Sequence, residues 1–339
     1  MTSDLSRLAP IALTMGEPAG IGPELAPAAF DALRGEVPFF LIGDPNHLPA
    51  GCKFSEISTP AEAHDTQDLP VLRHDFGPDR TPGTPLGAHA QHVVDVIARA
   101  VRLVQEGEAS AICTNPIHKK ALKDGAGFRF PGHTEFLADL AGGAEVVMML
   151  ACEELRVVPA TIHIPLSEVP STLSQDRLAQ VIRTTHDALI RDFGLATPRI
   201  AVAGLNPHAG EGGAMGMEEI TMISPLLDEL RSEGLDLSGP RSADTMFHSA
   251  ARAGYDAAIC MYHDQALIPI KTIDFAGGVN VTLGLPFVRT SPDHGTAFDI
   301  AGQGKADPSS LIAALRMGWT MANARKAGLR NTNHKDGTR

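Results

Sequence analysis

The chain has 339 residues, of which 43% are hydrophobic and 20% charged, enough for two domains or one large one. Its net charge of −12 argues against a general nucleic-acid-binding protein, but it does not exclude a local basic pocket for an anionic ligand. Four scattered cysteines, the absence of a membrane-length apolar run and an N-terminus without a signal segment predict a cytoplasmic protein with no nucleic-acid or membrane partner.

In the N-terminal half, apolar runs alternate with segments of helical period. We expect a strand over 11–14, then the Gly/Pro-rich loop GEPAGIGPEL, a helix over about 23–33 and a strand over 37–42. Residues 45–85 show too little periodicity to place any element. The clearest helix covers 87–106, because six aliphatic residues share one of its faces: Val93, Val96, Ile97, Ala100, Val101 and Val104. A strand over 109–113 follows, and the segment TNPIHKKAL after it opens a helix.

In the C-terminal half, residues 145–165 predict two antiparallel strands joined by a polar turn at Glu153 and Glu154. Helices are expected over 174–191, 218–232, 243–253 and about 309–326, with strands over 199–205, 257–262 and 279–285. The polar tail after Ala327 is predicted to be disordered. Strands that alternate with helices indicate an α/β fold with mixed, mostly parallel sheets.

Three histidines follow expected strands: His163 ends the run VVPATIHIP, His208 lies in NPHAGEGG and His263 begins HDQ. Ligands of open α/β sheets bind beyond the carboxyl ends of strands, so the three imidazoles are placed to converge on a divalent metal. The chain has 14 histidines, however, and the spacing matches no short metal motif. The pattern alone therefore leaves open whether these three bind a metal or are structural.

A second set of residues suits an anion. His133 and Thr134 lie at an expected helix start, Lys271 and Arg289 lie close to expected strand ends, and Asn280 lies between them. For each of these side chains taken singly, the pattern favours an ordinary solvated surface position over a binding role.

The segment DHGTAFDIAGQGKADP, residues 293–308, has few bulky side chains, so its backbone can approach a ligand closely. Gly295 and Gly302 lie in it, and Asp299 is placed to accept hydrogen bonds from two ribose hydroxyls, which favours NAD over NADP. The alternative is an ordinary Gly-rich loop before a helix.

Taken together, these segments resemble the 4-hydroxythreonine-4-phosphate dehydrogenase family of vitamin B6 biosynthesis. The resemblance runs in order from about Ile11 to Asn323 and is carried by seven motifs: GEPAGIGPEL, GHTEFLA, VVMMLACEELRV, GLNPHAGEGG, ADTMF, MYHDQALIPIK and VNVTLGLPFVRTSPDHGTAFDIAGQGKAD. It implies an isocitrate/isopropylmalate dehydrogenase-like fold with two α/β/α domains, a cleft between them and a homodimer with active sites shared between subunits. The expected domains are a cofactor-side domain (1–128 with 285–330), a metal, substrate and dimerisation domain (129–284) and a tail (331–339).

The resemblance also implies the site. The family's metal ligands fall on His163, His208 and His263, holding one divalent Zn, Co, Ni, Mn or Mg ion. Its substrate-binding residues fall on five positions: His133, Thr134, Lys271, Asn280 and Arg289. The 293–308 loop is similar to the NAD-adenosine loop of β-decarboxylating dehydrogenases. The role of GEPAGIGPEL is left open.

The implied reaction is NAD-dependent oxidation of 4-phosphooxy-L-threonine at C3 to a β-keto acid, which loses CO₂ to give 3-amino-2-oxopropyl phosphate. Asp244 and Asp264 are candidates for the general base, or for orienting a metal-bound histidine. The main alternative is a dehydrogenase of 4-phospho-D-threonate or D-erythronate 4-phosphate with the same fold and metal site. A metal-dependent hydrolase is a further alternative, against which the 293–308 loop argues.

Overall fold

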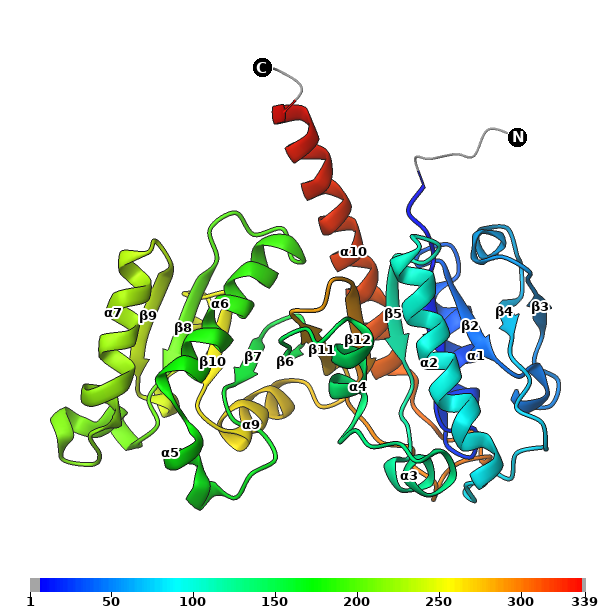
Figure 1. Cartoon of the computed structure of the whole chain (residues 1–339), viewed down its shortest axis with the longest axis horizontal. Coiled ribbons are helices and arrows are strands. Elements are labelled where there is room, and N and C mark those ends of the chain that lie inside the picture. The colour runs from blue at the N-terminus through cyan, green and yellow to red at the C-terminus, as the bar shows by residue number, and fades with distance from the viewer. Residues whose placement is uncertain (1–6, 337–339) are drawn as a thin grey trace. The chain divides into compact units, whose positions relative to one another are not determined.

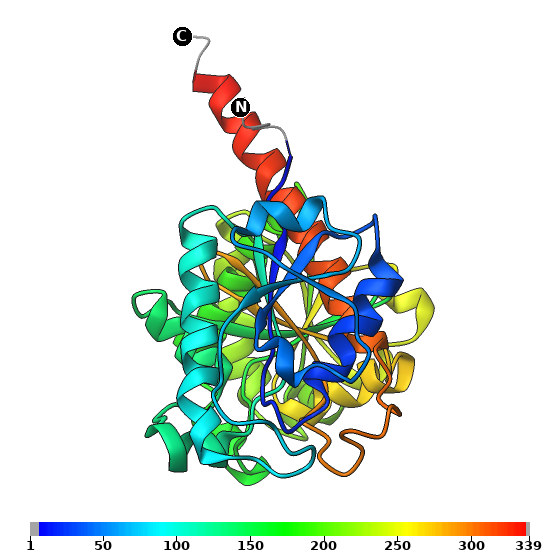
Figure 2. The ribbon, with the colours of Figure 1, turned by 90° about the vertical axis from the view of Figure 1, so that its right-hand side faces the viewer.

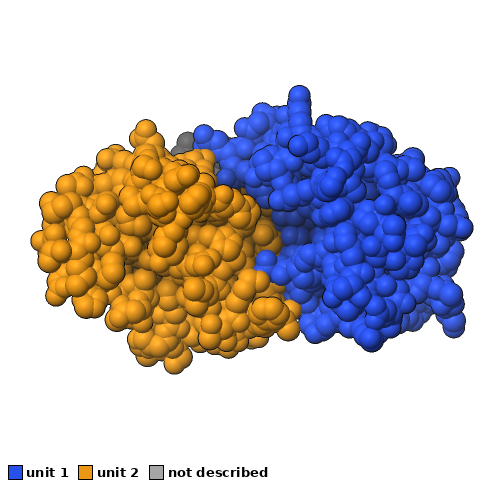
Figure 3. Space-filling view, turned by 90° about the horizontal axis from the view of Figure 1, so that it is seen from below, with its two compact units in different colours: residues 1–146, 285–339 blue, residues 147–284 orange. Residues whose placement is uncertain are grey.

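The computed structural model describes residues 7 to 336. The chain divides into two compact units, which Figure 3 colours separately: unit 1 comprises residues 1–146 and 285–339, and unit 2 comprises residues 147–284. The sequence-based division also breaks the chain between 284 and 285, but it assigns 129–146 to the second domain. The structure groups these residues with unit 1, because Phe136 and Leu137 are buried in its hydrophobic core.

Unit 1 is built on a parallel sheet with the strand order β3-β4-β2-β1-β5-β12. The strands are β1 (Ile11–Thr14), β2 (Phe39–Gly43), β3 (Phe54–Glu56), β4 (Leu69–Arg73), β5 (Ala111–Thr114) and β12 (Val288–Pro292). The helices are α1 (Gly22–Leu33), α2 (Ala90–Gln105), α3 (Lys119–Ala126), α4 (His133–Leu140) and α10 (Ser309–Asp336) (Figure 1).

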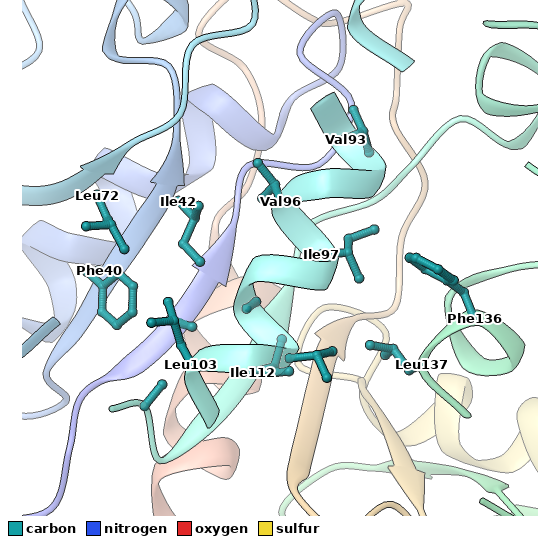
Figure 4. Packing of buried hydrophobic residues seen from close by; sticks show 14 of the residues in the cluster. Phe40, Ile42, Leu72, Val93, Val96, Ile97, Leu103, Ile112, Phe136 and Leu137 are labelled. Carbon is teal, nitrogen blue, oxygen red and sulfur yellow. The ribbon is translucent and has the colours of Figure 1, made fainter. Parts of the chain in front are cut away.

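Helix α2 forms because its apolar face has a partner. Five of the six predicted inward residues are fully buried and the sixth, Val104, packs partly buried against the same cluster. Figure 4 shows Val96 and Ile97 of α2 among side chains from β2, β4 and β5. Burying this face at about 25 cal/mol per Å² of apolar surface stabilises α2 far more than its intrinsic propensity.

Three strands of unit 1 were not predicted from the sequence. Strand β3 has only three residues, β4 contains Pro70, and β12 reads VRTSP, a polar sequence that is nevertheless buried throughout. A polar buried strand carries no hydrophobic pattern, so periodicity cannot find it. The predicted disorder of the tail is wrong for 328–336, which continue α10. The C-terminal half of this helix projects from unit 1 in Figure 2. Residues 337–339 lie outside the described residues.

Unit 2 has a mixed sheet with the order β11-β6-β7-β10-β8-β9, in which β6 pairs antiparallel with both β11 and β7 and the other neighbours are parallel. Its strands are β6 (Val147–Ala151), β7 (Arg156–Pro159), β8 (Arg199–Ala203), β9 (Asp236–Arg241), β10 (Ala257–Cys260) and β11 (Val279–Leu283). Its helices are α5 (Val169–Thr172), α6 (Gln175–Arg191), α7 (Ser224–Ser232), α8 (Ser249–Arg252) and α9 (His263–Ile273). The predicted antiparallel pair, β6 and β7, is confirmed.

Several elements of unit 2 differ from expectation. Strand β9 and the short helix α5 were not predicted. The predicted helix over 243–253 is a 3-10 turn (Ala243–Thr245) followed by the short α8, and the segment HDQALIPIKTI forms the unpredicted helix α9. Pro269 inside a run of apolar residues hides the helical period of α9. The predicted class, α/β with mostly parallel sheets, is confirmed. Within the described chain, no helix combines the length and hydropathy that a membrane crossing requires.

Candidate active site

The three predicted metal histidines follow three neighbouring strands of unit 2. Strands β7, β10 and β8 are adjacent and parallel, so their carboxyl ends lie at one edge of the sheet. His163 follows β7, His263 begins α9 just after β10, and His208 lies in the 3-10 segment Pro207–Gly213 after β8. This edge is where open α/β sheets bind ligands.

His163 and His263 lie together at this edge. Backbone hydrogen bonds continue past the strand ends, from Ala160 N to the Cys260 carbonyl (2.7 Å) and from Thr161 N to the Met261 carbonyl (3.2 Å). The two imidazole centroids are 5.7 Å apart, and both residues line a pocket of about 260 Å³. His163 has a φ of 39°, a strained conformation for a non-glycine residue that is typical of functional sites.

The residues after His263 hold it in place. Asp264 Oδ1 lies 2.8 Å from His263 Nδ1, which leaves Nε2 of that ring to face a ligand. Gln265 Nε2 donates to the Gly204 carbonyl (2.8 Å), and its Oε1 accepts from Met261 N (2.6 Å). Gln265 therefore ties the end of β10 to the end of β8, a positioning role that the sequence analysis missed because it depends on which strands are neighbours.

His208 lies in a left-handed turn: residues 208–212 all have positive φ, including three that are not glycine. The buried carboxylate of Glu219 anchors this turn by accepting from Asn206 N (2.8 Å) and Asn206 Nδ2 (2.9 Å). His208 itself is 62% exposed, with Nδ1 3.6 Å from Glu211. Among the described residues, His208 is not gathered with His163 and His263 into a group whose ligand atoms lie within 4.8 Å of one another.

Asp244 lies in the 3-10 turn Ala243–Thr245 of unit 2, where its exposed carboxylate accepts a hydrogen bond from the Ser242 hydroxyl. Of the two predicted base candidates, Asp264 is thus engaged with a histidine ring and Asp244 with a serine hydroxyl.

The predicted anion-binding residues of unit 1 are His133, Thr134 and Arg289. His133 and Thr134 begin α4, where free backbone N–H groups favour negative charge. Arg289 is the second residue of its strand and so lies close to a strand end, as expected. It lies within β12 and is only 3% exposed, with Nη2 donating to Thr114 Oγ1 at 2.7 Å.

The electrostatics of this cluster favour an anion. Burial lowers the pKa of Arg289 to about 10, so the guanidinium stays charged at neutral pH. Burial, together with the nearby charges of Arg289 and Lys119, lowers the pKa of His133 well below its usual range. A buried guanidinium beside a neutral imidazole is an environment that a phosphate or carboxylate would stabilise.

The other two predicted anion-binding residues belong to unit 2. Lys271 lies in the last turn of α9, with Nζ 5.3 Å from the centroid of the Phe275 ring. Asn280 lies in β11, opposite Leu150 of β6, and its buried Oδ1 makes no hydrogen bond within the described chain.

The GEPAGIGPEL loop supports the predicted cofactor loop. Ile21 N donates to the Thr296 carbonyl (3.1 Å), and the Glu24 carboxylate accepts from the backbone N–H groups of Gly302 and Gly304. A Cβ at Gly20 would lie 2.9 Å from the Thr296 carbonyl oxygen, so this close approach requires glycine. The sequence left the role of this loop open, and the structure places it as the packing partner of residues 293–308.

The predicted cofactor residues differ in environment. Gly295 has open space where a Cβ would point, and Asp299 is exposed. Gly302 has a φ of +79°, and a Cβ there would lie 2.8 Å from Pro82. Gly302 is therefore required by the turn itself.

Two polar residues that the sequence analysis overlooked lie at the ends of β1 and β5. Thr14 and Asn115 are both 0% exposed, and neither Thr14 Oγ1 nor the Asn115 side-chain amide makes a hydrogen bond within the described chain. Buried polar groups are usually paired, so these two mark a place for a ligand or ordered water. The signal in the sequence is the polar residue that closes each apolar strand, IALT and AICTN.

In both units, polar side chains gather at the carboxyl ends of mostly parallel strands, where α/β enzymes bind their ligands. The family follows from comparison: the chain belongs to the PdxA family, since a family model described as pyridoxal phosphate biosynthetic protein PdxA matches residues 37–318. Membership makes the chain a dehydrogenase of vitamin B6 biosynthesis.

The relatives cover nearly the whole chain. A 4-hydroxythreonine-4-phosphate dehydrogenase of Paracoccus denitrificans is 64% identical, over 93% of this chain and 98% of its own. The one from Roseobacter denitrificans is 61% identical, over 93% and 97%. A crystal structure of 4-hydroxythreonine-4-phosphate dehydrogenase from Klebsiella pneumoniae has a TM-score of 0.83 and 38% identity, over 93% of this chain and 99% of its own.

Proposed function

We propose that this enzyme oxidises 4-phosphooxy-L-threonine at C3 with NAD⁺, giving a β-keto acid that loses CO₂ to leave 3-amino-2-oxopropyl phosphate. The names of the relatives at 64% and 61% identity support the substrate. The structural observation that carries the proposal is the buried, charged Arg289 beside the N-terminus of α4, a place suited to the phosphate group.

In this proposal the phosphate is bound by unit 1. The Arg289 guanidinium, already oriented by Thr114, provides the charge, and the backbone N–H groups at the start of α4 donate hydrogen bonds. His133 is neutral at pH 7, so its ring donates one N–H to the phosphate, and Thr134 adds a hydroxyl. We also assign Lys271 and Asn280 to substrate binding, as the family resemblance implies.

We further propose that His163, His208 and His263 hold one divalent cation (Zn, Co, Ni, Mn or Mg) and that the enzyme is a homodimer. The donor set fits such an ion, because His163 and His263 already lie side by side and Asp264 orients the second ring. The outlying position of His208 supports a site shared between subunits, to which His208 comes from the other subunit. When bound, the cation supplies positive charge that lowers the pKa of the C3 hydroxyl.

The proton of that hydroxyl needs an acceptor. The hydrogen bond between Asp264 and His263 supports a positioning role for Asp264, which leaves Asp244 as the proposed general base. An Asp244→Asn variant should lose kcat without losing the metal, whereas Asp264→Asn should lower metal affinity.

The residues of the 293–308 loop fit NAD. Gly295 leaves open space beside the backbone, and the exposed Asp299 is available for the ribose hydroxyls, while Gly302 and Glu24 hold the shape of the loop. When bound, NAD⁺ supplies the hydride acceptor. We therefore propose unit 1 as the cofactor-side domain and unit 2 as the metal-binding and dimerisation domain.

The test is NADH formation with 4-phosphooxy-L-threonine, 4-phospho-D-threonate and D-erythronate 4-phosphate, each with and without a chelator. We expect a chelator-sensitive preference for the amino acid. Arg289→Lys should raise KM for the substrate at least tenfold because a lysine cannot make the paired bonds of a guanidinium, and the surface variant Arg316→Lys should not. A preference for a sugar acid would show that the enzyme acts on the alternative substrate class. Unchanged activity in Arg289→Lys would refute the proposed phosphate site.

A further inference from the structure

A histidine-rich cluster in unit 1 lies outside every residue set discussed above. His74 follows β4, while His92 and Asp95 lie one turn apart on the same face of α2. One ligand atom from each of the three side chains lies within 4.8 Å of the other two, and among the described residues no other trio of His, Cys, Asp or Glu does so. We call these three residues the His74 cluster.

The geometry of the two imidazoles matches metal coordination. His74 Nε2 lies 3.3 Å from His92 Nδ1. Two nitrogen ligands at 2.0–2.1 Å from a tetrahedral Zn²⁺ are separated by about 3.3 Å. The pair therefore already has the spacing of one edge of a zinc tetrahedron, and Asp95 lies on the same side.

The surroundings hold the two rings in this arrangement. The buried Phe76 ring packs against both His74 and His92, with centroid distances of 5.5 Å in each case. The Asp95 carboxylate accepts from Gln91 Nε2 (2.8 Å), a contact that orients a ligating oxygen.

The neighbouring histidines show the contrast. His47 and His89 also pack against Phe76, but their Nε2 atoms lie 3.2 Å and 2.8 Å from the Pro78 carbonyl oxygen. A carbonyl acceptor explains that second pair as structural. His74 and His92 instead share a hydrogen bond between their two rings, and within the described chain neither of these two nitrogens is paired with a backbone acceptor.

We propose that the His74 cluster is a second metal site, separate from the proposed catalytic ion, which binds one Zn²⁺-class divalent cation through two imidazoles and a carboxylate. Nitrogen and oxygen donors of this kind suit Zn²⁺, Co²⁺ or Ni²⁺ rather than Ca²⁺ or Mg²⁺. The ion would join the end of β4 to α2 and stabilise unit 1 without taking part in the reaction.

The experiment uses the purified full-length chain, stripped of metal and titrated with Zn²⁺ alone by calorimetry, with bound zinc counted after gel filtration. The His208→Ala background weakens the proposed catalytic site, so that the remaining tight zinc belongs to the His74 cluster. In that background, His92→Gln and Asp95→Asn should each weaken zinc binding at least tenfold and lose the zinc-induced rise in Tm. His186→Gln is the matched control, since His186 lies 3.2 Å from Asp187 without a second imidazole.

Substitution with Co²⁺ gives a second readout, because a tetrahedral site gives visible d–d absorption that His92→Gln should abolish. In the otherwise unchanged chain, His92→Gln and Asp95→Asn should retain dehydrogenase activity within twofold. Equal unfolding midpoints in EDTA establish that each variant is folded, and the exposed Asp95 keeps the test valid if His92→Gln is unstable. Zinc affinity that is the same in His92→Gln, Asp95→Asn and the parent would overturn the proposal.

Discussion

The buried Glu219 carboxylate is the anchor of the His208 turn, and Glu219→Gln tests this assignment. Glu219 is 2% exposed and accepts two hydrogen bonds from Asn206, one from the backbone N–H and one from the side-chain amide. Hydrogen bonds to charged groups contribute about 1.5–3 kcal/mol each. Glutamine keeps one acceptor oxygen but places its NH₂ group against the Asn206 NH₂. We therefore expect the free energy of unfolding to fall by about 2–4 kcal/mol.

Urea denaturation, followed by circular dichroism, measures this loss directly. Glu218→Gln is the matched control, because Glu218 accepts from the same Asn206 amide at 2.8 Å but is less buried. Water replaces that bond, so the control should lose less than about 1 kcal/mol. Metal affinity should fall together with stability in Glu219→Gln, by about 10- to 100-fold, as expected when a residue that supports a metal ligand is changed. Equal stability and metal content in the two variants would refute the role of Glu219.

Three further predictions follow from packing, backbone conformation and protonation. Ile97→Ala, at a fully buried position of α2, should lower the free energy of unfolding in urea by about 2–5 kcal/mol. Ile190→Ala, at a 41% exposed position, should change it by no more than about 0.5 kcal/mol. Equal losses of unfolding free energy in the two variants would contradict the packing described for α2. Gly302→Ala should raise KM for NAD⁺ more than Gly304→Ala does. Both glycines have a positive φ, but only at Gly302 would the new Cβ meet a neighbouring side chain, that of Pro82. Similar KM values in the two variants would show that crowding at Gly302 is unimportant. Burial depresses the pKa of His133 in the folded state. The stability that its neutral ring contributes is therefore present above about pH 6.5 and is lost as pH falls from there toward the depressed value. His133→Asn should reduce the slope of unfolding free energy against pH between about 7.5 and 5, and an unchanged slope would refute the assignment.

Local pattern was sufficient wherever an element buries one face against a neighbour. The aliphatic spacing of α2 and the inward residues of α6 follow from helical periodicity, and β6 and β7 follow from two apolar runs joined by a polar turn. Where neither a period nor an uninterrupted apolar run is present, prediction failed. Strand β12 is polar yet buried throughout, and α9 is apolar around an internal proline, so neither shows its own period.

The candidate site divides in the same way. The positions of His163 and His263 after strands could be recognised in the chain, but their closeness depends on β7 and β10 being neighbours. The burial of Arg289 could not be recognised, because a charged residue in a polar segment is usually solvated.

The sequence by itself therefore determined the family, the α/β class and the residue types gathered near strand ends, since long motifs and short-range periodicity are properties of consecutive residues. Only the tertiary structure decided which of these residues meet. Glu24 holds Gly302 and Gly304 across most of the chain length, and His74 meets His92 through the packing of α2 beside β4. Such contacts depend on strand order, register and helix orientation. These are determined by how the whole core packs and cannot be predicted from consecutive residues alone.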